Sequence, residues 1–210
     1  MRRLFLVALF CIVAGTASAA DFAQMSRPRF TPADQADLDR ISTYLNAAQT
    51  LEGSFVQIGP EGQVDEGRFY IQKPGRMRFE YAVPNPTLIV SDGSSVAVIN
   101  KKLNTTDRYP IWTTPLSLIL SDSIDLKKNL AIIGLEHQDG QLVVVARSHS
   151  SRATGNITLV FSEPNIELRQ WTVIDAQSLT TTVSVRDLKQ GVSIDPTLFA
   201  ISDAAAKREN

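Results

Sequence analysis

The sequence predicts a mainly β protein built around one strongly curled antiparallel sheet. In one strand-like run Met77, Phe79 and Tyr81 alternate with charged residues, which places apolar groups on one face and charges on the other. Pro74-Gly75 separates this run from the preceding one, because proline presets φ and glycine supplies positive φ for a chain reversal. The connections between strand-like runs are too short for helical crossovers, so the strands pair antiparallel.

Residues 1–20 are predicted to be a secretory signal peptide and are excluded from the fold. Arg2 and Arg3 form a basic start, residues 4–13 an apolar segment, and residues 17–20 a small-residue cleavage site. The apolar segment is shorter than the roughly 20 residues that a membrane anchor needs. We therefore expect one exported domain over residues 21–210, in the periplasm.

Composition excludes several function classes. The single cysteine, Cys11, lies in the apolar segment of the signal and lacks the small preceding residue of a lipidation site. The mature chain then has no thiol for disulfides, zinc or nucleophilic catalysis. Removing Arg2 and Arg3 from the 21 basic residues leaves 19 against 22 acidic ones, a formal charge of −3. This charge disfavours nucleic acid and anionic lipid headgroups as partners.

An amphipathic helix is predicted from Pro32 to Gln49. Thr31 is its N-cap, proline occupies the first position, and Asp34 lies in the first turn. Four apolar residues at helical spacing form the stripe that should lie on the sheet: Leu38, Ile41, Leu45 and Ala48.

Strands dominate from Leu51 onward. We expect them at 52–58, 65–72, 77–82, 87–91, 95–100, 104–109, 130–136, 142–148, 156–162, 166–175 and 180–188. Turn residues such as Asp92-Gly93 and Asp139-Gly140 lie between them. Eleven strands exceed what an open twisted sheet usually holds flat, so the sheet should curl strongly.

One segment interrupts the strands. Thr114 to Leu120 begins with threonine before proline and is apolar on most of its circumference, which predicts a short buried helix. We interpret it as a lid on the concave face of the sheet, followed by a further turn at 123–126. Residues 195–199 are expected to form a turn followed by a short edge strand or a docking segment, and residues 204–210 to be disordered.

Candidate catalytic groups are sparse. His137 and His149 are interpreted as solvated loop histidines, and no Gly-x-Ser-x-Gly elbow is present. No phosphate-binding glycine loop occurs, and Asp122 with Asp125 is a weak metal signal. Paired carboxylates for sugar hydrolysis stay open, although nothing singles out a pair. We expect no enzyme activity and no cofactor.

Aromatic residues are spread over many strands, which indicates a hydrophobic core. They are Phe55, Phe69, Tyr70, Phe79, Tyr81, Trp112, Phe161 and Trp171. A curled sheet closed by one short helix can leave an interior that its own side chains do not fill, and such interiors hold apolar ligands.

The chain resembles the LolA family of periplasmic lipoprotein carriers over nearly all of its mature length. The matching stretches, in order, are 53–57 (GSFVQ), 67–71 (GRFYI), 73–81 (KPGRMRFEY), Pro84 and Pro86, 88–93 (LIVSDG), and 114–116 (TPL). The run from Pro74 to Tyr81 together with the later Ser-Asp-Gly is the most specific part.

The resemblance implies an open half-barrel with helices in its mouth and an apolar cavity for the acyl chains of lipoproteins. The cavity residues it suggests are Phe55, Phe69, Met77, Phe79, Tyr81, Leu116, Ile119 and Leu120. It also implies a monomer that takes lipoproteins from an inner-membrane ABC transporter and delivers them to an outer-membrane receptor where one exists. The missing lipidation site favours the soluble carrier over that receptor.

One position departs from the family pattern. Family members usually have arginine where this chain has Lys73, and that arginine ties the barrel to the lid. Lysine lacks the planar guanidinium fork, so the closed state should be weaker or held differently. Lys73 and Arg76 are the candidate lid latch, and Arg78 is a second arginine that could take over the role. Two alternatives stay open: a carrier or sensor of another amphiphile, such as a glycolipid or hopanoid, and a secreted hydrolase that uses His137 or His149.

Overall fold

A computed structural model describes residues 30–114, 117, 119–148, 155–175 and 177–201. Eleven strands form one sheet. They are β1 (Thr50–Ile58), β2 (Val64–Gln72), β3 (Arg76–Tyr81), β4 (Thr87–Asp92), β5 (Ser95–Asn100), β6 (Thr105–Pro110), β7 (Leu130–Gln138), β8 (Gln141–Ser148), β9 (Asn156–Ser162), β10 (Glu167–Ile174) and β11 (Thr180–Gln190). The predicted strands are confirmed to within two residues at every end, and the signal peptide lies outside the described residues.

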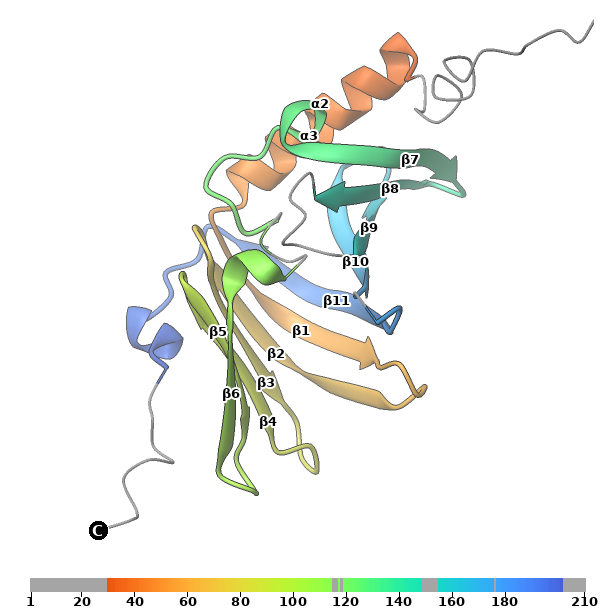
Figure 1. Ribbon diagram of the computed structural model, residues 1–210. Coiled ribbons are helices and arrows are strands. Elements are labelled where there is room, and N and C mark those ends of the chain that lie inside the picture. Colours follow the sequence, from red (N-terminus) through yellow and green to blue (C-terminus); the bar gives the residue numbers. More distant parts are fainter. Residues whose placement is uncertain (1–29, 115–116, 118, 149–154, 176, 202–210) are drawn as a thin grey trace, which may run out of the picture.

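The strand order is β6-β5-β4-β3-β2-β1-β11-β10-β9-β8-β7, and every neighbouring pair is antiparallel. The first and last strands meet in the middle of the sheet, where β1 pairs with β11. The two edges, β6 and β7, are consecutive in sequence and are joined by residues 111–129. The connection between the edges therefore crosses the mouth of the curled sheet (Figure 1).

The curl has a local cause where β1 and β2 pair. Phe69 lies opposite Gly53, and Phe55 lies opposite Gly67, so each ring covers the glycine of the neighbouring strand. A Cβ on Gly67 would stand 2.1 Å from the carbonyl oxygen of Glu80 and 2.8 Å from the Phe55 ring. Glycine permits this close approach of strands, and an aromatic ring packed over it restores the buried surface that a side chain would have given.

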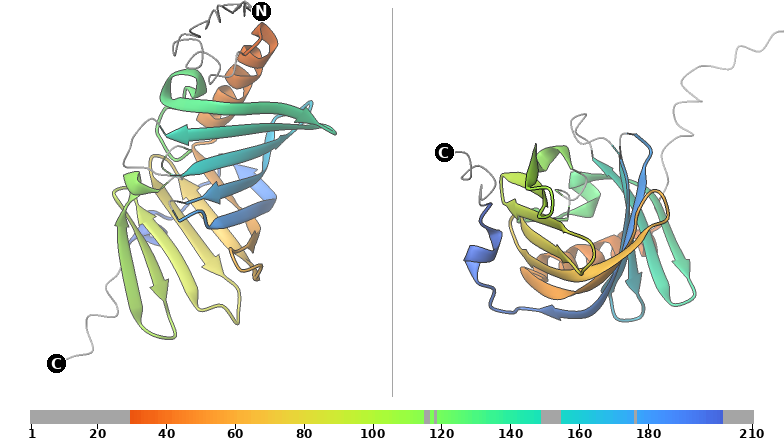
Figure 2. Two further views of the ribbon diagram at one scale, coloured as in Figure 1. Left: turned by 45° about the vertical axis from the view of Figure 1, so that its right-hand side comes forward. Right: turned by 90° about the horizontal axis from the view of Figure 1, so that it is seen from below.

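Helix α2 (Pro32–Ala47) packs inside the curve of the sheet (Figure 2). Its start is a capping box, in which the Thr31 hydroxyl accepts from Asp34 N and the Asp34 carboxylate accepts from Thr31 N. The predicted apolar stripe is buried along its whole length. The helix ends at Ala47, two residues before the predicted end.

The segment between the two edge strands contains a 3₁₀ helix, η1 (Ile111–Thr113), and a short helix, α3 (Leu126–Asn129). Of the lid helix predicted from Thr114 to Leu120, residues 115, 116 and 118 lie outside the described part of the chain. In the described remainder Ser117 N donates to Thr114 O at 3.1 Å. A hydrogen bond between residues three apart is the 3₁₀ pattern. The lid helix therefore stays a prediction.

The C-terminal segment forms a 3₁₀ helix, η3 (Pro196–Phe199), that contacts β3 and β4. It lies on the convex face, because Arg78, which faces away from Met77 and Phe79, donates from Nη1 to Leu198 O at 2.9 Å. Phe199 and Val90 are both buried there, apart from the main core. This confirms the docking segment predicted for residues 195–199. Among the described residues, no helix is long and apolar enough to cross a membrane.

Candidate functional site

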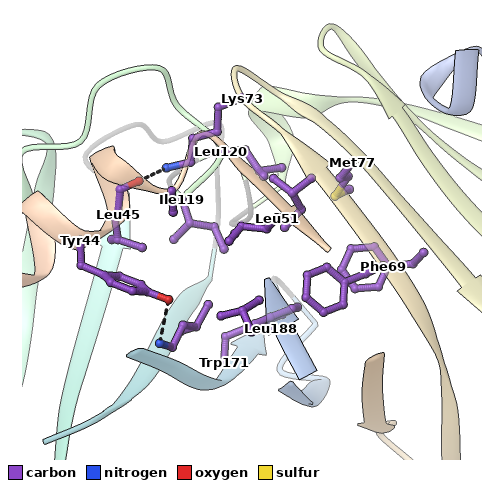
Figure 3. A pocket seen from close by; sticks show the side chains of 14 residues that line it. Tyr44, Leu45, Leu51, Phe69, Lys73, Met77, Ile119, Leu120, Trp171 and Leu188 are labelled. Carbon is purple, nitrogen blue, oxygen red and sulfur yellow. Dashed lines mark hydrogen bonds between the residues drawn. The ribbon is translucent and has the colours of Figure 1, made fainter. Parts of the chain in front are cut away.

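A cavity of about 30 Å³ lies where α2, the central strands and the lid segment meet (Figure 3). Its lining is almost wholly apolar. The residues are Tyr44, Leu45, Ala48, Leu51, Phe69, Ile71, Lys73, Met77, Phe79, Ile119, Leu120, Leu168, Trp171 and Leu188. A space of this volume holds no more than one or two water molecules. The cavity as it stands therefore admits only water-sized molecules, and we call it the closed cavity.

A larger hollow of about 220 Å³ adjoins this cavity on the concave face. The two spaces share Met77, Phe79 and Trp171 as a common wall. The other residues around the hollow are Gln57, Tyr81, Ile89, Thr114, Val173, Thr181 and Val183. Displacement of the shared side chains would join the two spaces into one apolar channel.

Two of the three residues of this shared wall, Phe79 and Trp171, are aromatic and pack against further aromatic rings. Phe79 stacks on Phe69 with ring centroids 5.7 Å apart, and its ring meets Trp171 edge-on at 6.1 Å. Phe55 contacts Phe79 and Tyr81 edge-on at 5.2 and 5.1 Å. Such edge and stacked contacts are each worth about 0.5–1.5 kcal/mol beyond area burial, so the wall is ordered although it borders empty space.

Five of the proposed cavity residues line the closed cavity: Phe69, Met77, Phe79, Ile119 and Leu120. Tyr81 lines the hollow, where its hydroxyl donates to Gln57 Oε1 at 2.7 Å and burial raises the pKa of its phenol to about 12. Phe55 lies behind Phe79 and Tyr81 and lines neither space. Leu116 lies outside the described residues.

Tyr44, Leu168, Trp171 and Leu188 line the cavity although sequence reasoning did not select them as site residues. The ladder between β9 and β10 shifts register between Leu168 and Gln170, and β11 shifts against β1 near Asp187. These bulges bring Leu168 with Trp171, and Val185 with Leu188, onto one face at a spacing of three. A search for alternation with a period of two misses them.

The family profile described as "Outer membrane lipoprotein carrier protein LolA" matches residues 46–202. The chain belongs to the LolA family. Proteins named outer-membrane lipoprotein carrier protein are similar to it: that of Methylococcus capsulatus is 28% identical over 175 residues, covering 79% of this chain and 83% of the relative. That of Bordetella avium is 28% identical over 171 residues, covering 77% and 80%.

The LolA-family chain also shares its fold with a solved structure, a DUF1329 family protein from Desulfovibrio piger. The TM-score is 0.50 at 11% sequence identity, and the match covers 79% of this chain and 95% of that one.

Lys73 is the basic residue among the described residues that line the apolar cavity of this LolA-family protein. Its Nζ donates to Leu45 O at 2.6 Å (Figure 3). The backbone N–H of Lys73 donates to Gln49 O at 2.9 Å. Burial lowers the pKa of its ammonium to about 8, and the Asp122 carboxylate opposes that shift. Arg76 is exposed, and its Nη1 lies 3.4 Å from Gln72 Oε1. The role of both residues as a lid latch stays a prediction.

The described part of the segment across the mouth is attached at several points, and two of them hold Leu120 and Ile124. At one, Gly75 N in the β2–β3 turn donates to Leu120 O at 2.8 Å. At the other, the Asn46 side chain of α2 makes both hydrogen bonds of an amide pair with the backbone of Ile124, each 2.8 Å. Leu120 and Ile124 are thus two fixed points, one on the sheet and one on α2, and Thr114 comes before both of them in the chain.

The prediction that His137 is a loop residue is wrong, although its side chain is 50% exposed, as expected of a solvated residue. It lies in β7, where Nδ1 is 2.8 Å from Glu163 Oε2 and Nε2 is 3.1 Å from Asp37 Oδ2. Arg40 of α2 contacts both of these carboxylates and also donates to Pro164 O. The network joins α2 to the β9–β10 turn. The sequence does not indicate it, because Asp37 and Glu163 are 100 and 26 residues from His137. His149 lies outside the described residues.

Trp112 was also expected in the core, but its side chain is 54% exposed. It belongs to η1, at the edge of the sheet where the chain leaves β6. Among the described residues, no group of three histidine, cysteine or carboxylate side chains is arranged to hold a metal ion. The chemistry that the site offers is apolar contact.

Proposed function

We propose that the protein carries lipoproteins across the periplasm and shields their acyl chains in the joined cavity and hollow. The observation that carries this proposal is the closed apolar cavity beside an open apolar hollow, separated by three side chains. Membership of the LolA family and relatives named as lipoprotein carriers support the same function. The protein acts by binding and needs no catalytic group.

The energetics suit a carrier. An acyl chain of roughly 16 carbons loses about 12 kcal/mol on exposure to water, at about 0.8 kcal/mol for each methylene. A cavity that replaces the bilayer must therefore be apolar throughout, and polar handles add little. The closed cavity of about 30 Å³ is too small for such a chain, so uptake requires the segment between Thr114 and Leu120 to move away from the β2–β3 turn.

The proposed partners follow from this role. The cargo is a lipoprotein received from an inner-membrane ABC transporter and passed to an outer-membrane receptor where the organism has one, and the carrier works as a monomer. Cleavage of residues 1–20 would leave the chain soluble in the periplasm. Movement of cargo toward the more favourable apolar site then needs no chemical work by the carrier.

Photocrosslinking tests this function. A photoreactive phenylalanine analogue replaces Tyr81, which lines the hollow, and in a matched control it replaces Tyr70, on the opposite face of the neighbouring strand. Crosslinks to an acylated lipoprotein released from spheroplasts are expected at position 81 and not at position 70. The same lipoprotein without its acyl chains should give no crosslink. Equal crosslinking of the acylated and unacylated forms would overturn the proposal.

A further inference from the structure

Exposed apolar side chains gather at one rim of the sheet. Eight large apolar side chains are exposed among the described residues, and five of them lie at hairpin tips: Ile58, Val64, Val83, Leu103 and Leu179. Their exposed fractions range from 48% for Ile58 to 95% for Val83. Exposed apolar residues are ordinary when they are scattered singly, so their gathering at one end of the molecule needs a cause.

These five residues occupy four tips that are neighbours in the sheet. Leu103 is on the β5–β6 tip, Val83 on β3–β4, Ile58 and Val64 on β1–β2, and Leu179 on β10–β11. Ile58 and Val64 face each other directly in the register of their strands. The strand order places the four tips side by side along one arc (Figure 1). We call these five residues the apolar rim.

The opposite end of the sheet differs. Its turns lie at residues 73–75, 93–94, 139–140 and 163–166, and none of them has a large exposed apolar side chain. One of them contains Glu163, part of the charged network around His137. The asymmetry indicates that the apolar rim is a feature of one end of the barrel and not of hairpin tips in general.

The apolar rim surrounds the end of the hollow. Gln57, Tyr81 and Thr181 line the hollow, and each lies within two residues of a rim residue. Gln57 directly precedes Ile58, Tyr81 comes two residues before Val83, and Thr181 two residues after Leu179. Whatever surface the rim touches therefore faces the end of the hollow.

We propose that the apolar rim docks on the surface of a lipid bilayer and turns the hollow toward the acyl chains of the membrane. The rim residues sit on separate tips along an arc, and they form no groove among themselves. A protein partner would need a complementary contiguous patch, whereas a fluid bilayer accommodates separate apolar side chains at its interface. The docking goes beyond the proposed carrier function, which does not require it.

The charges at the tips decide which lipid fits. Lys101 and Lys102 adjoin Leu103 on one tip. Glu61 lies on a second tip, where Asp65 follows Val64, and Asp175 lies on a third. Two positive and three negative charges leave a formal charge of −1 on these tips, so the rim has no electrostatic preference for anionic headgroups. The docking surface is therefore a zwitterionic bilayer, bound through the apolar side chains and insensitive to salt.

Flotation with vesicles tests the proposal. Wild-type protein without the signal peptide is mixed with phosphatidylcholine vesicles, alone or with added phosphatidylglycerol. The variant Val83→Ser, Leu103→Ser, Leu179→Ser removes three rim residues that lie outside strands. Its control, Tyr109→Ser with Ile133→Ser, removes exposed apolar side chains from the edge strands β6 and β7. We expect about a tenfold fall in the fraction of rim variant that floats, and wild-type behaviour of the control.

A site-specific probe gives a second readout. The mature chain has no cysteine, so a single cysteine at Val83 or at Ile133 can be labelled with an environment-sensitive dye. Vesicles should shift the emission of the dye at position 83 and leave it unchanged at position 133. No flotation of the wild type, equal flotation of the rim variant, or flotation only with phosphatidylglycerol would each overturn the proposal.

The carrier function is tested separately in the same variants. Acyl-dependent crosslinking at Tyr81 should persist in the rim variant with a lipoprotein in solution, because the rim residues do not line the hollow. Loss of flotation with intact crosslinking places the defect in docking. Absence of crosslinking in the wild type would contradict the carrier function. Docking on the bilayer would then still be tested by flotation, independently of the carrier function.

Discussion

Lys73 donates a hydrogen bond of 2.6 Å from Nζ to the carbonyl oxygen of Leu45. Leu45 lies in the last turn of α2, whose final four carbonyl groups have no partner within the helix. No basic residue of α2 itself lies in that turn, so the donor comes from the β2–β3 turn. The link joins the end of α2 to the sheet directly beside the attachment of the lid segment at Gly75.

Lys73 should make the free energy of unfolding depend on pH in the alkaline range. Burial lowers the pKa of Lys73 in the folded protein to about 8 from the ordinary 10.5. Between these values the unfolded chain binds more protons than the folded one, so the free energy of unfolding rises with pH. We expect wild-type stability to rise from pH 8 to pH 10 relative to Lys73→Met, as measured by urea denaturation. Parallel pH profiles of the two proteins would contradict this.

The network around His137 should make the free energy of unfolding depend on pH in the acidic to neutral range. Both ring nitrogens face carboxylate oxygens, and only the protonated imidazole can donate to both, so the contacts favour the protonated form. The hydrogen bond to Glu163 is the main cause that raises the pKa of His137, and the charges of Glu163 and Asp37 add to it. Protonated His137 thus stabilises the fold below pH 6.5, and this contribution is lost as pH rises through the raised pKa.

His137→Gln is the test of that network. The wild type should melt at a higher temperature than the variant at pH 5.5, and the difference should shrink by pH 8. Arg40 also faces the same carboxylates and holds part of the network when His137 is neutral. A melting difference that stays constant from pH 5.5 to pH 8 would show that the histidine acts by packing alone.

The glycines under the aromatic rings should be sensitive to a single methyl group. A Cβ at Gly67 would overlap the Glu80 carbonyl oxygen at 2.1 Å, so Gly67→Ala should lower the free energy of unfolding by about 1–3 kcal/mol. Gly134→Ala is the matched control, since its Cβ would meet Val145 at an ordinary 3.5 Å. The control should be neutral or more stable by up to about 1 kcal/mol. Equal effects in urea denaturation would argue against the close approach at Gly67.

The success of strand prediction from sequence has a local cause. Turns such as Pro74-Gly75 and Asp139-Gly140 are set by the φ preferences of two residues, so their positions and the strands between them follow from short windows. The pattern Gly-x-Phe occurs at Gly53 and again at Gly67, and it carries a signal for the curl. Its meaning depends on the register of β1 with β2, which brings each ring onto the other glycine.

The site was less predictable because it depends on contacts between distant segments. The partners of His137 come from α2 and from the β9–β10 turn. Leu168 and Leu188 lie on the cavity face only because bulges shift the register of their strands. The docking of α2 leaves no mark on the alternation of apolar and polar residues, and each bulge replaces a spacing of two by a spacing of three.

Trp171 should report cargo binding, because it lines both the cavity and the hollow. Trp112→Phe leaves Trp171 as the single tryptophan, and Trp171→Phe leaves the exposed Trp112 as a matched control. A lipopeptide with brominated acyl chains should quench the emission of Trp171 and leave that of Trp112 nearly unchanged, since bromine quenches tryptophan only at short range. Quenching of both tryptophans to the same extent would mean that the acyl chains bind outside the hollow. Quenching of Trp171 alone would place the acyl chains against the rings of Phe69 and Phe79, where the cavity and the hollow must join to admit them.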